Sequence, residues 1–170
     1  MNNIILIGFM GSGKTSIGKQ LSNMNHYQFL DTDCLIEQSQ NKKIADIFQT
    51  DGEEAFREME TQCLMDLLNE TQNVPRILSV GGGLALRKVN QELLKQFGYV
   101  IYLRAKPETI YCRLMNDKTR PLLQGDNPEK KINTMMGERN AIYESISDLV
   151  IDVDNKMIEE ISREILEEDI

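Results

Sequence analysis

The stretch that most constrains the fold of this chain is residues 8–15, Gly-Phe-Met-Gly-Ser-Gly-Lys-Thr, which directly follow the apolar run Ile4–Ile7. Four residues separate Gly8 from Gly13, and a lysine and a threonine come next, so the spacing is that of a Walker A phosphate-binding loop. An apolar strand, this loop and an amphipathic helical pattern beginning near Lys14 occur in the order that such a loop requires. The alternative, a glycine-rich turn with an accidental lysine, does not account for that order.

Each residue type in the loop suits the binding of phosphates. Glycines let the backbone wrap with its N–H groups pointing inward, and the start of the following helix adds positive partial charge. Lys14 can reach the β- and γ-phosphates, and the Thr15 hydroxyl can bind the Mg²⁺ ion that these phosphates share. The residues of the loop and helix start predicted to hold ATP are Gly11, Ser12, Gly13, Lys14, Thr15 and Ser16.

Composition limits the classes of protein to which the chain can belong. With 170 residues, 41% hydrophobic and 27% charged, it suits one compact domain with a real core. A formal net charge of −8 argues against a nucleic-acid or membrane-surface binder, because these normally present a basic face. The three cysteines are widely spaced without a CxxC pair, which predicts neither a disulfide framework nor a zinc site. With no leader-like or membrane-spanning apolar run, we expect a cytoplasmic protein, and a monomer.

Strand and helix patterns alternate about five times along the chain. The predicted strands are residues 4–7, 27–30, 77–80, 99–103 and 149–151. The predicted helical stretches are 17–24, 35–71 with a break at Asp51-Gly52, 89–97, a helix from 107, 132–145 and 157–166. This alternation predicts an α/β fold of the P-loop NTPase type, a three-layer sandwich in which a five-stranded parallel sheet carries helices on both faces.

Acidic residues and glycines stand where two of the predicted strands end. Asp31 and Asp33 follow the second strand, at the edge where open α/β sheets bind their ligands. Gly81-Gly82-Gly83 follows the third strand, either to relieve a tight turn or to let a ligand approach the backbone. Because that strand lacks the terminal acid of a Walker B motif, Asp31 is the predicted second contact for Mg²⁺.

Two arginines have alternative interpretations from sequence alone. Arg57 either binds an anionic ligand or is a solvated partner of the neighbouring acids Glu53, Glu54 and Glu60. Arg120 lies in residues 116–128, a polar stretch punctuated by proline and glycine. That stretch is either a plain surface loop or, as we expect for a fold with no other obvious cover, a mobile lid over the site.

Six motifs occur in order along the chain: GFMGSGKTS, FLDTDCLIE, DGEEAFREME, SVGGG, RPLL and ERNAIYE. Their joint order and spacing resemble the shikimate kinase family over essentially the whole chain. The resemblance implies Mg²⁺-dependent transfer of the ATP γ-phosphoryl group to the 3-hydroxyl of shikimate, in the pathway to chorismate and the aromatic amino acids. The alternatives are a related gluconate or nucleoside monophosphate kinase, or a nucleotide-binding module without turnover.

The resemblance also implies roles for single residues. Asp33 would take the proton of the attacking hydroxyl, Lys14 would neutralise the γ-phosphate, and Arg120 of RPLL would reach the transferred group from the lid. Arg113 matches an arginine that stacks near adenine. The residues implied to surround shikimate are Asp33, Arg57, Gly81, Gly82, Gly83 and Arg139. Within a single domain of residues 1–170, the resemblance implies a substrate-binding helical segment at about 33–70 and a lid at about 116–128.

Overall fold

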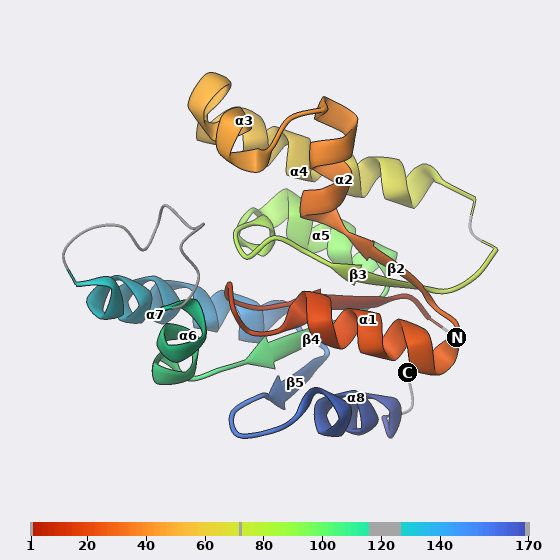
Figure 1. Cartoon of the computed structure of the whole chain (residues 1–170). Coiled ribbons are helices and arrows are strands. Elements are labelled where there is room, and N and C mark those ends of the chain that lie inside the picture. The colour runs from red at the N-terminus through yellow and green to blue at the C-terminus, as the bar shows by residue number, and fades with distance from the viewer. Residues whose placement is uncertain (1, 72, 116–126, 169–170) are drawn as a thin grey trace.

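The computed structural model describes residues 2–71, 73–115 and 127–168 (Figure 1). The strands are β1 (Ile4–Ile7), β2 (Gln28–Asp31), β3 (Arg76–Ser79), β4 (Tyr99–Arg104) and β5 (Leu149–Asp152). The helices are α1 (Lys14–Asn25), α2 (Thr32–Gln40), α3 (Ile44–Thr50), α4 (Gly52–Asn69), α5 (Lys88–Phe97), α6 (Pro107–Leu114), α7 (Pro128–Ile146) and α8 (Ile158–Leu166), with a 3₁₀ turn η1 (Leu84–Leu86). No helix in these ranges is both long and apolar enough to cross a membrane.

The five strands form one parallel sheet in the order β2-β3-β1-β4-β5. The strand that precedes the phosphate-binding loop is therefore central, and Ile5 of β1 lies opposite Leu78 of β3 and Val100 of β4. Each predicted strand agrees with an observed one to within one residue at each end. The predicted fold class, a five-stranded parallel sheet with helices on both faces, is confirmed.

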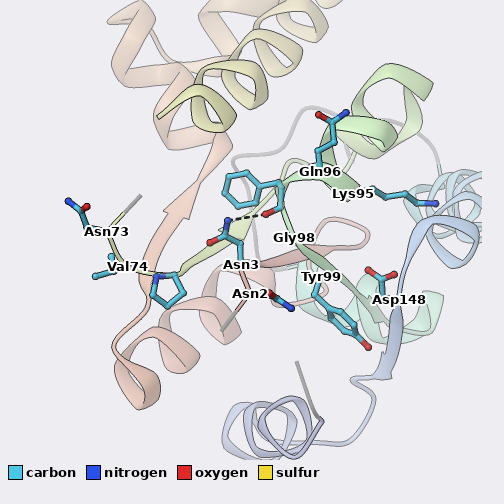
Figure 2. A pocket seen from close by; sticks show the side chains of 11 residues that line it. Asn2, Asn3, Asn73, Val74, Lys95, Gln96, Gly98, Tyr99 and Asp148 are labelled. Atoms are coloured by element: carbon cyan, nitrogen blue, oxygen red, sulfur yellow. Dashed lines mark hydrogen bonds between the residues drawn. The ribbon is translucent and has the colours of Figure 1, made fainter. Parts of the chain in front are cut away.

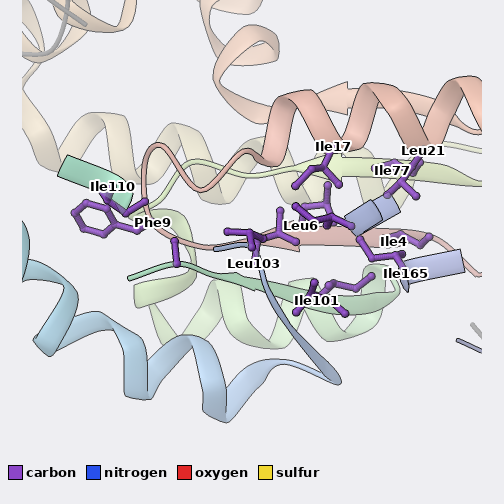
Figure 3. Close-up of a cluster of buried hydrophobic side chains, with 14 of the residues drawn as sticks. Ile4, Leu6, Phe9, Ile17, Leu21, Ile77, Ile101, Leu103, Ile110 and Ile165 are labelled. Atoms are coloured by element: carbon purple, nitrogen blue, oxygen red, sulfur yellow. The ribbon is translucent and has the colours of Figure 1, made fainter. Parts of the chain in front are cut away.

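Alternate side chains of β1 enter two separate hydrophobic cores, one on each face of the sheet. Ile4 and Leu6 face helices α1 and α8, where they pack with side chains such as Ile17 and Ile165 (Figure 3). Ile5 and Ile7 face the other way, into the core formed with α4, α5 and the end of α7. Because both faces are covered, the strand is apolar at every position, and this burial is the main favourable term holding the layers together.

The predicted helical stretch 35–71 forms three helices, α2, α3 and α4. The break at Gly52 was predicted, and its φ of 86° is the left-handed conformation that glycine tolerates. A second break was not predicted: Asn41 ends α2 with φ 50°. Ile36, Ile47 and Phe56 from the three helices form a small third core of their own.

Helix α7 begins earlier than the sequence pattern predicted. The prediction placed its start at residue 132, whereas the helix begins at Pro128, within the predicted lid of residues 116–128. Asn127 is the N-cap, and its side-chain oxygen accepts a hydrogen bond from the Lys130 N–H at 3.1 Å. The end of the predicted lid is thus a helix cap, and the rest of it, residues 116–126 with Arg120, lies outside the described residues.

Two glycines inside helices provide a matched test of this packing. A Cβ on Gly18 of α1 would lie 2.4 Å from Cε2 of Phe29 on β2, whereas a Cβ on Gly137 of α7 would meet no heavy atom within 4 Å. We expect Gly18→Ala to lower the free energy of unfolding by about 1–3 kcal/mol, because overpacking outweighs the better helix propensity of alanine.

Gly137→Ala is the control and should raise the free energy of unfolding by up to about 1 kcal/mol. Urea denaturation of both variants measures the two effects. A gain in stability for Gly18→Ala equal to that for Gly137→Ala would contradict the close packing of α1 on β2.

Candidate active site

The phosphate-binding loop wraps around the N-terminal end of α1. Gly8 and Gly13 have φ values of 143° and 101°, which L-residues with a side chain rarely adopt. A Cβ on Gly8 would also lie 2.7 Å from the carbonyl oxygen of Leu103 on β4. Gly13 is the N-cap of α1, so the loop leads directly into the positive end of that helix.

Lys14 is held at this loop by the loop's own carbonyl groups. Its ammonium group donates hydrogen bonds to the carbonyl oxygens of Gly8 at 2.9 Å and Phe9 at 3.0 Å. A lysine carries three N–H donors on a flexible stem, so its charge stays at the loop and can be redirected to a phosphate oxygen.

Asp31, the last residue of β2, connects the loop to helix α2. Its Oδ2 accepts a hydrogen bond from the Thr15 hydroxyl at 3.0 Å. Its Oδ1 caps α2 by accepting hydrogen bonds from the N–H groups of Asp33 at 3.1 Å and Cys34 at 3.3 Å. The two residues that were predicted to serve Mg²⁺, Thr15 and Asp31, are therefore in direct contact.

These two side chains suit Mg²⁺ by the chemistry of their donor atoms. The ion prefers oxygen ligands, and it is usually bound through one or two protein groups together with phosphates and waters. Among the described residues no group of three or more His, Cys, Asp or Glu side chains could hold a metal on its own. A hydroxyl beside one carboxylate at a phosphate-binding loop fits an ion that arrives with a nucleotide.

A cavity of about 200 Å³ joins the phosphate-binding loop to the acids after β2 and the glycines after β3. It lies at the carboxyl edge of the sheet, where the neighbouring strands β1 and β3 end side by side. Its lining consists of Met10, Gly11, Gly13, Lys14, Thr15, Ser16, Asp31, Asp33, Ser79, Val80, Gly81 and Gly82. Most of the predicted site residues thus line one cavity.

Close contacts explain the glycines after β3 better than a tight turn does. None of Gly81, Gly82 and Gly83 is among the glycines with positive φ. A Cβ on Gly81 would lie 2.8 Å from both Asp33 Oδ1 and Glu60 Oε1, and one on Gly83 would lie 2.4 Å from Arg57 Nη1. Gly81 and Gly83 are therefore required by the close approach of the protein's own side chains, and the approach of a ligand to this backbone stays a prediction.

Arg57 is paired with two of the acids named as its possible partners. Its guanidinium contacts Glu60 at 2.7 Å and Glu53 at 3.2 Å. Glu54 pairs instead with Arg87. The Arg57 side chain is still 19% exposed, and its guanidinium carries five N–H donors. The two ion pairs therefore orient the guanidinium and leave some of its N–H donors for a ligand.

Glu60 is the least expected group in the site, because its side chain is completely buried. Burial raises the pKa of its carboxyl to about 7, with the neighbouring charge of Asp33 acting in the same direction and Arg57 and Arg87 in the opposite one. The sequence predicts Glu60 only as a solvated partner of Arg57. The spacing of three residues between the two was visible, but the burial was not.

Arg139 approaches the site from α7. Its guanidinium lies over the ring of Phe9, 5.5 Å from the ring centroid. One helical turn later, the buried Tyr143 donates a hydrogen bond from its hydroxyl to the carbonyl oxygen of Gly82. Neither Tyr143 nor Thr32, whose hydroxyl accepts a hydrogen bond from the Gly81 N–H at 3.1 Å, was a predicted site residue.

The described site residues that were predicted but do not line this cavity are Ser12, Arg57, Gly83, Arg113 and Arg139. Arg113 donates hydrogen bonds to the carbonyl oxygens of Gly11 at 3.0 Å and Ser12 at 3.3 Å, so it braces the phosphate-binding loop. Ser12 is buried, and its N–H donates to the Phe9 carbonyl at 3.2 Å. Arg120 lies outside the described residues.

A larger cavity, about 660 Å³, lies at the opposite, amino-terminal edge of the strands (Figure 2). Its central side chain, Asn3, holds the neighbouring segments together: Nδ2 donates to the Phe97 carbonyl and Oδ1 accepts from the Arg76 N–H, both at 2.9 Å. None of the predicted site residues lines it. The smaller cavity is therefore the candidate active site.

Comparison with known proteins identifies close relatives over nearly the whole chain. A family model described as shikimate kinase matches residues 10–169. A curated shikimate kinase from Caldanaerobacter subterraneus subsp. tengcongensis is 38% identical over 98% of this chain and 95% of its own length. A solved shikimate kinase from Acinetobacter baumannii, in complex with shikimate, has a TM-score of 0.90 at 36% identity and covers 98% of this chain and 91% of its own.

More distant kinases share only the fold. A gluconokinase from Sinorhizobium meliloti has a TM-score of 0.55 at 16% identity, over 97% of this chain and 89% of its own. The family predicted from the six motifs is confirmed, and with it the class of reaction, phosphoryl transfer from ATP to an alcohol. On its sequence and on its structure, the chain belongs to the shikimate kinase family.

Proposed function

We propose that this chain phosphorylates the 3-hydroxyl of shikimate in the cavity where the phosphate-binding loop, Asp33 and Gly81 meet. The observation that carries this proposal is that donor-side and acceptor-side residues line the same small cavity. The solved relative from Acinetobacter baumannii in complex with shikimate supports the choice of acceptor.

On the donor side, the phosphate-binding loop and the start of α1 hold the phosphates of ATP, and Lys14 neutralises charge on the γ-phosphate. Thr15 and Asp31 hold Mg²⁺, which neutralises phosphate charge when it is bound. The direct contact between these two side chains supports their joint role. Gly11, Gly13 and Ser16, which line the cavity, and Ser12 within the loop complete the nucleotide site.

On the acceptor side, Asp33 is the general base. The hydroxyl oxygen of shikimate attacks the γ-phosphorus, the bond from that phosphorus to the β–γ bridging oxygen breaks, and ADP leaves with the electron pair. Asp33 takes the hydroxyl proton. Its place in the first turn of α2, in the cavity lining, supports this role.

Arg57 and Arg139 hold the carboxylate of shikimate. Their planar guanidinium groups can make paired, charge-assisted hydrogen bonds to it. Glu60 and Glu53 orient Arg57, while Gly81, Gly82 and Gly83 let the backbone approach the ring. The Arg57 guanidinium lies so close to Gly83 that a side chain at residue 83 would collide with it. This closeness supports a pocket in which the arginine and the glycines face one ligand.

Three assignments are carried by the family resemblance. Arg120 closes over the transferred phosphoryl group as part of a lid, Arg113 contributes to the adenine side, and α2 to α4 form the substrate-binding segment of a single domain. The contact of Arg113 with the phosphate-binding loop supports its place near the nucleotide. We also propose a cytoplasmic monomer, in keeping with the net charge of −8 and the unpaired thiols.

Release of ADP by the purified chain with Mg²⁺ and ATP tests the proposed function. Shikimate, gluconate and nucleoside monophosphates are supplied one at a time, and mass spectrometry identifies the product. We expect turnover with shikimate alone, giving shikimate 3-phosphate. Turnover with another acceptor, or nucleotide binding without turnover, would contradict the proposal.

Asp33→Asn tests the general base. The amide keeps the shape of the side chain but accepts no proton at neutral pH, so kcat should fall roughly 10²-fold or more. Steady-state kinetics with shikimate and ATP measures the effect, and Asp46→Asn on the exposed surface of α3 is the matched control. A normal kcat with a raised KM for shikimate would make Asp33 a binding residue only.

Glu60→Gln tests the burial of that carboxyl. Because the folded state raises its pKa from 4.5 to about 7, the folded protein binds a proton more tightly than the unfolded chain does. The stabilisation from this proton is full below pH 4.5 and is lost as the pH rises through about 7. The shift corresponds to at most about 3 kcal/mol.

Urea denaturation between pH 5 and 8 measures the difference in unfolding free energy between wild type and Glu60→Gln. We expect wild type to lose stability relative to the variant as the pH rises. Glu58→Gln, on the exposed face of the same helix, should show no such dependence. A difference in unfolding free energy that is constant between pH 5 and 8 would contradict a pKa of about 7 for Glu60.

A further inference from the structure

Two parts of the acceptor side come from distant parts of the chain. The glycine segment follows β3, whereas Arg139 lies on α7, more than fifty residues later in sequence. Tyr143 connects them. Its hydroxyl donates a hydrogen bond of 2.5 Å to the carbonyl oxygen of Gly82, 61 residues away in sequence.

Tyr143 and Arg139 are four residues apart on α7, so their side chains lie on the same face of the helix. The positive charges of Arg139 and Arg57 both act to lower the pKa of the phenol. Burial nevertheless raises the pKa of Tyr143, so the hydroxyl keeps its proton at neutral pH. It can therefore donate its hydrogen bond to the Gly82 carbonyl at neutral pH.

Gly82 in turn lies against the phosphate-binding loop. A Cβ on Gly82 would be 3.5 Å from the Gly8 carbonyl oxygen, 3.5 Å from the Met10 nitrogen and 3.8 Å from the Tyr143 hydroxyl. The backbone at Gly82 is thus confined between the loop that binds nucleotide and the phenol. A shift of this backbone would move the glycine segment relative to α7, the helix that carries both Tyr143 and Arg139.

We propose that Tyr143 is a positioning residue for the acceptor: its hydroxyl fixes the glycine segment relative to Arg139 and so sets the width of the pocket that takes a small carboxylate-bearing ring. This inference rests on the proposed function. Tyr143 need not touch the acceptor, because it acts through Gly82 and Arg139.

The ring and the hydroxyl of Tyr143 have separable roles. The ring is completely buried and packs on Tyr102, with the two centroids 5.2 Å apart. Tyr102 is also buried, with only 1% of its surface exposed, and its hydroxyl donates a hydrogen bond to Asn140 Oδ1 at 2.9 Å. Each tyrosine can therefore lose its hydroxyl by substitution to phenylalanine while its ring packing remains, and only one hydroxyl serves the pocket.

The test compares Tyr143→Phe with Tyr102→Phe. For Tyr143→Phe we expect the KM for shikimate to rise about tenfold, the size expected for one lost hydrogen bond at a buried carbonyl, while the KM for ATP changes less than about twofold. For Tyr102→Phe we expect both KM values to stay within about twofold of wild type. Urea denaturation of the two variants monitors the cost of losing a buried hydroxyl in each.

A double variant separates positioning from a general loss of stability. If Tyr143 acts through Arg139, then Tyr143→Phe should change the KM for shikimate by less than about twofold in an Arg139→Lys background, because the two effects are not additive. Full additivity would overturn the proposal. So would an equal rise of both KM values in Tyr143→Phe, or the same rise for shikimate in Tyr102→Phe.

The wild-type measurement distinguishes this inference from the function on which it rests. Absence of shikimate-dependent ADP release by wild type would overturn the proposed function and the inference with it. Normal shikimate-dependent turnover by wild type, with an unchanged KM for shikimate in Tyr143→Phe, would overturn the inference alone.

Discussion

Parallel pairing of β1 with β3 on one side and β4 on the other places the centre of the candidate site. Parallel strands end at the same edge of a sheet, so the loop after β1 and the glycines after β3 emerge side by side. β2, on the far side of β3, delivers Asp31 and Asp33 to the same edge. The phosphate-binding loop and the proposed acceptor-binding residues Asp33, Gly81 and Gly82 meet because hydrogen bonds between strands bring the strand ends together, although these residues are far apart in sequence.

Local charge explains how an acidic protein can work on anions. The net charge is −8, yet Lys14 lines the cavity, Arg57 lies beside Gly83, and Arg139 lies over Phe9 of the phosphate-binding loop. Glu60 and Glu53 hold Arg57 in place, whereas Lys14 is held by the carbonyl groups of the phosphate-binding loop. The same acids lower the net positive charge of the site, so that anionic substrates meet oriented donors in preference to a broad basic surface.

The fold was largely predictable because its signals are local. Apolar runs gave the five strands to within a residue, and the spacing from Gly8 to Thr15 gave the phosphate-binding loop. The contact of Asp31 with Thr15 could also be anticipated, since both follow strands at the same edge.

What could not be predicted depends on contacts between distant segments. The burial of Glu60 follows from the packing of α4 against the glycine segment, and glutamate is rarely buried. The hydrogen bonds of Thr32 to Gly81 and of Tyr143 to Gly82 span 49 and 61 residues. Asn41, which ends α2, and Asn127, which caps α7, set boundaries that apolar periodicity does not mark.

The two halves of helix α4 pack into different hydrophobic cores. Leu64 and Leu67 in its second half belong to the core of the sheet, whereas Phe56 belongs to the small cluster with Ile36 and Ile47. Arg57 and Glu60 sit at the boundary between the two. The small cluster buries far fewer side chains than either core of the sheet, so it is the place where local opening is expected to begin, while Leu35 and Cys63 tie the same helices to the sheet.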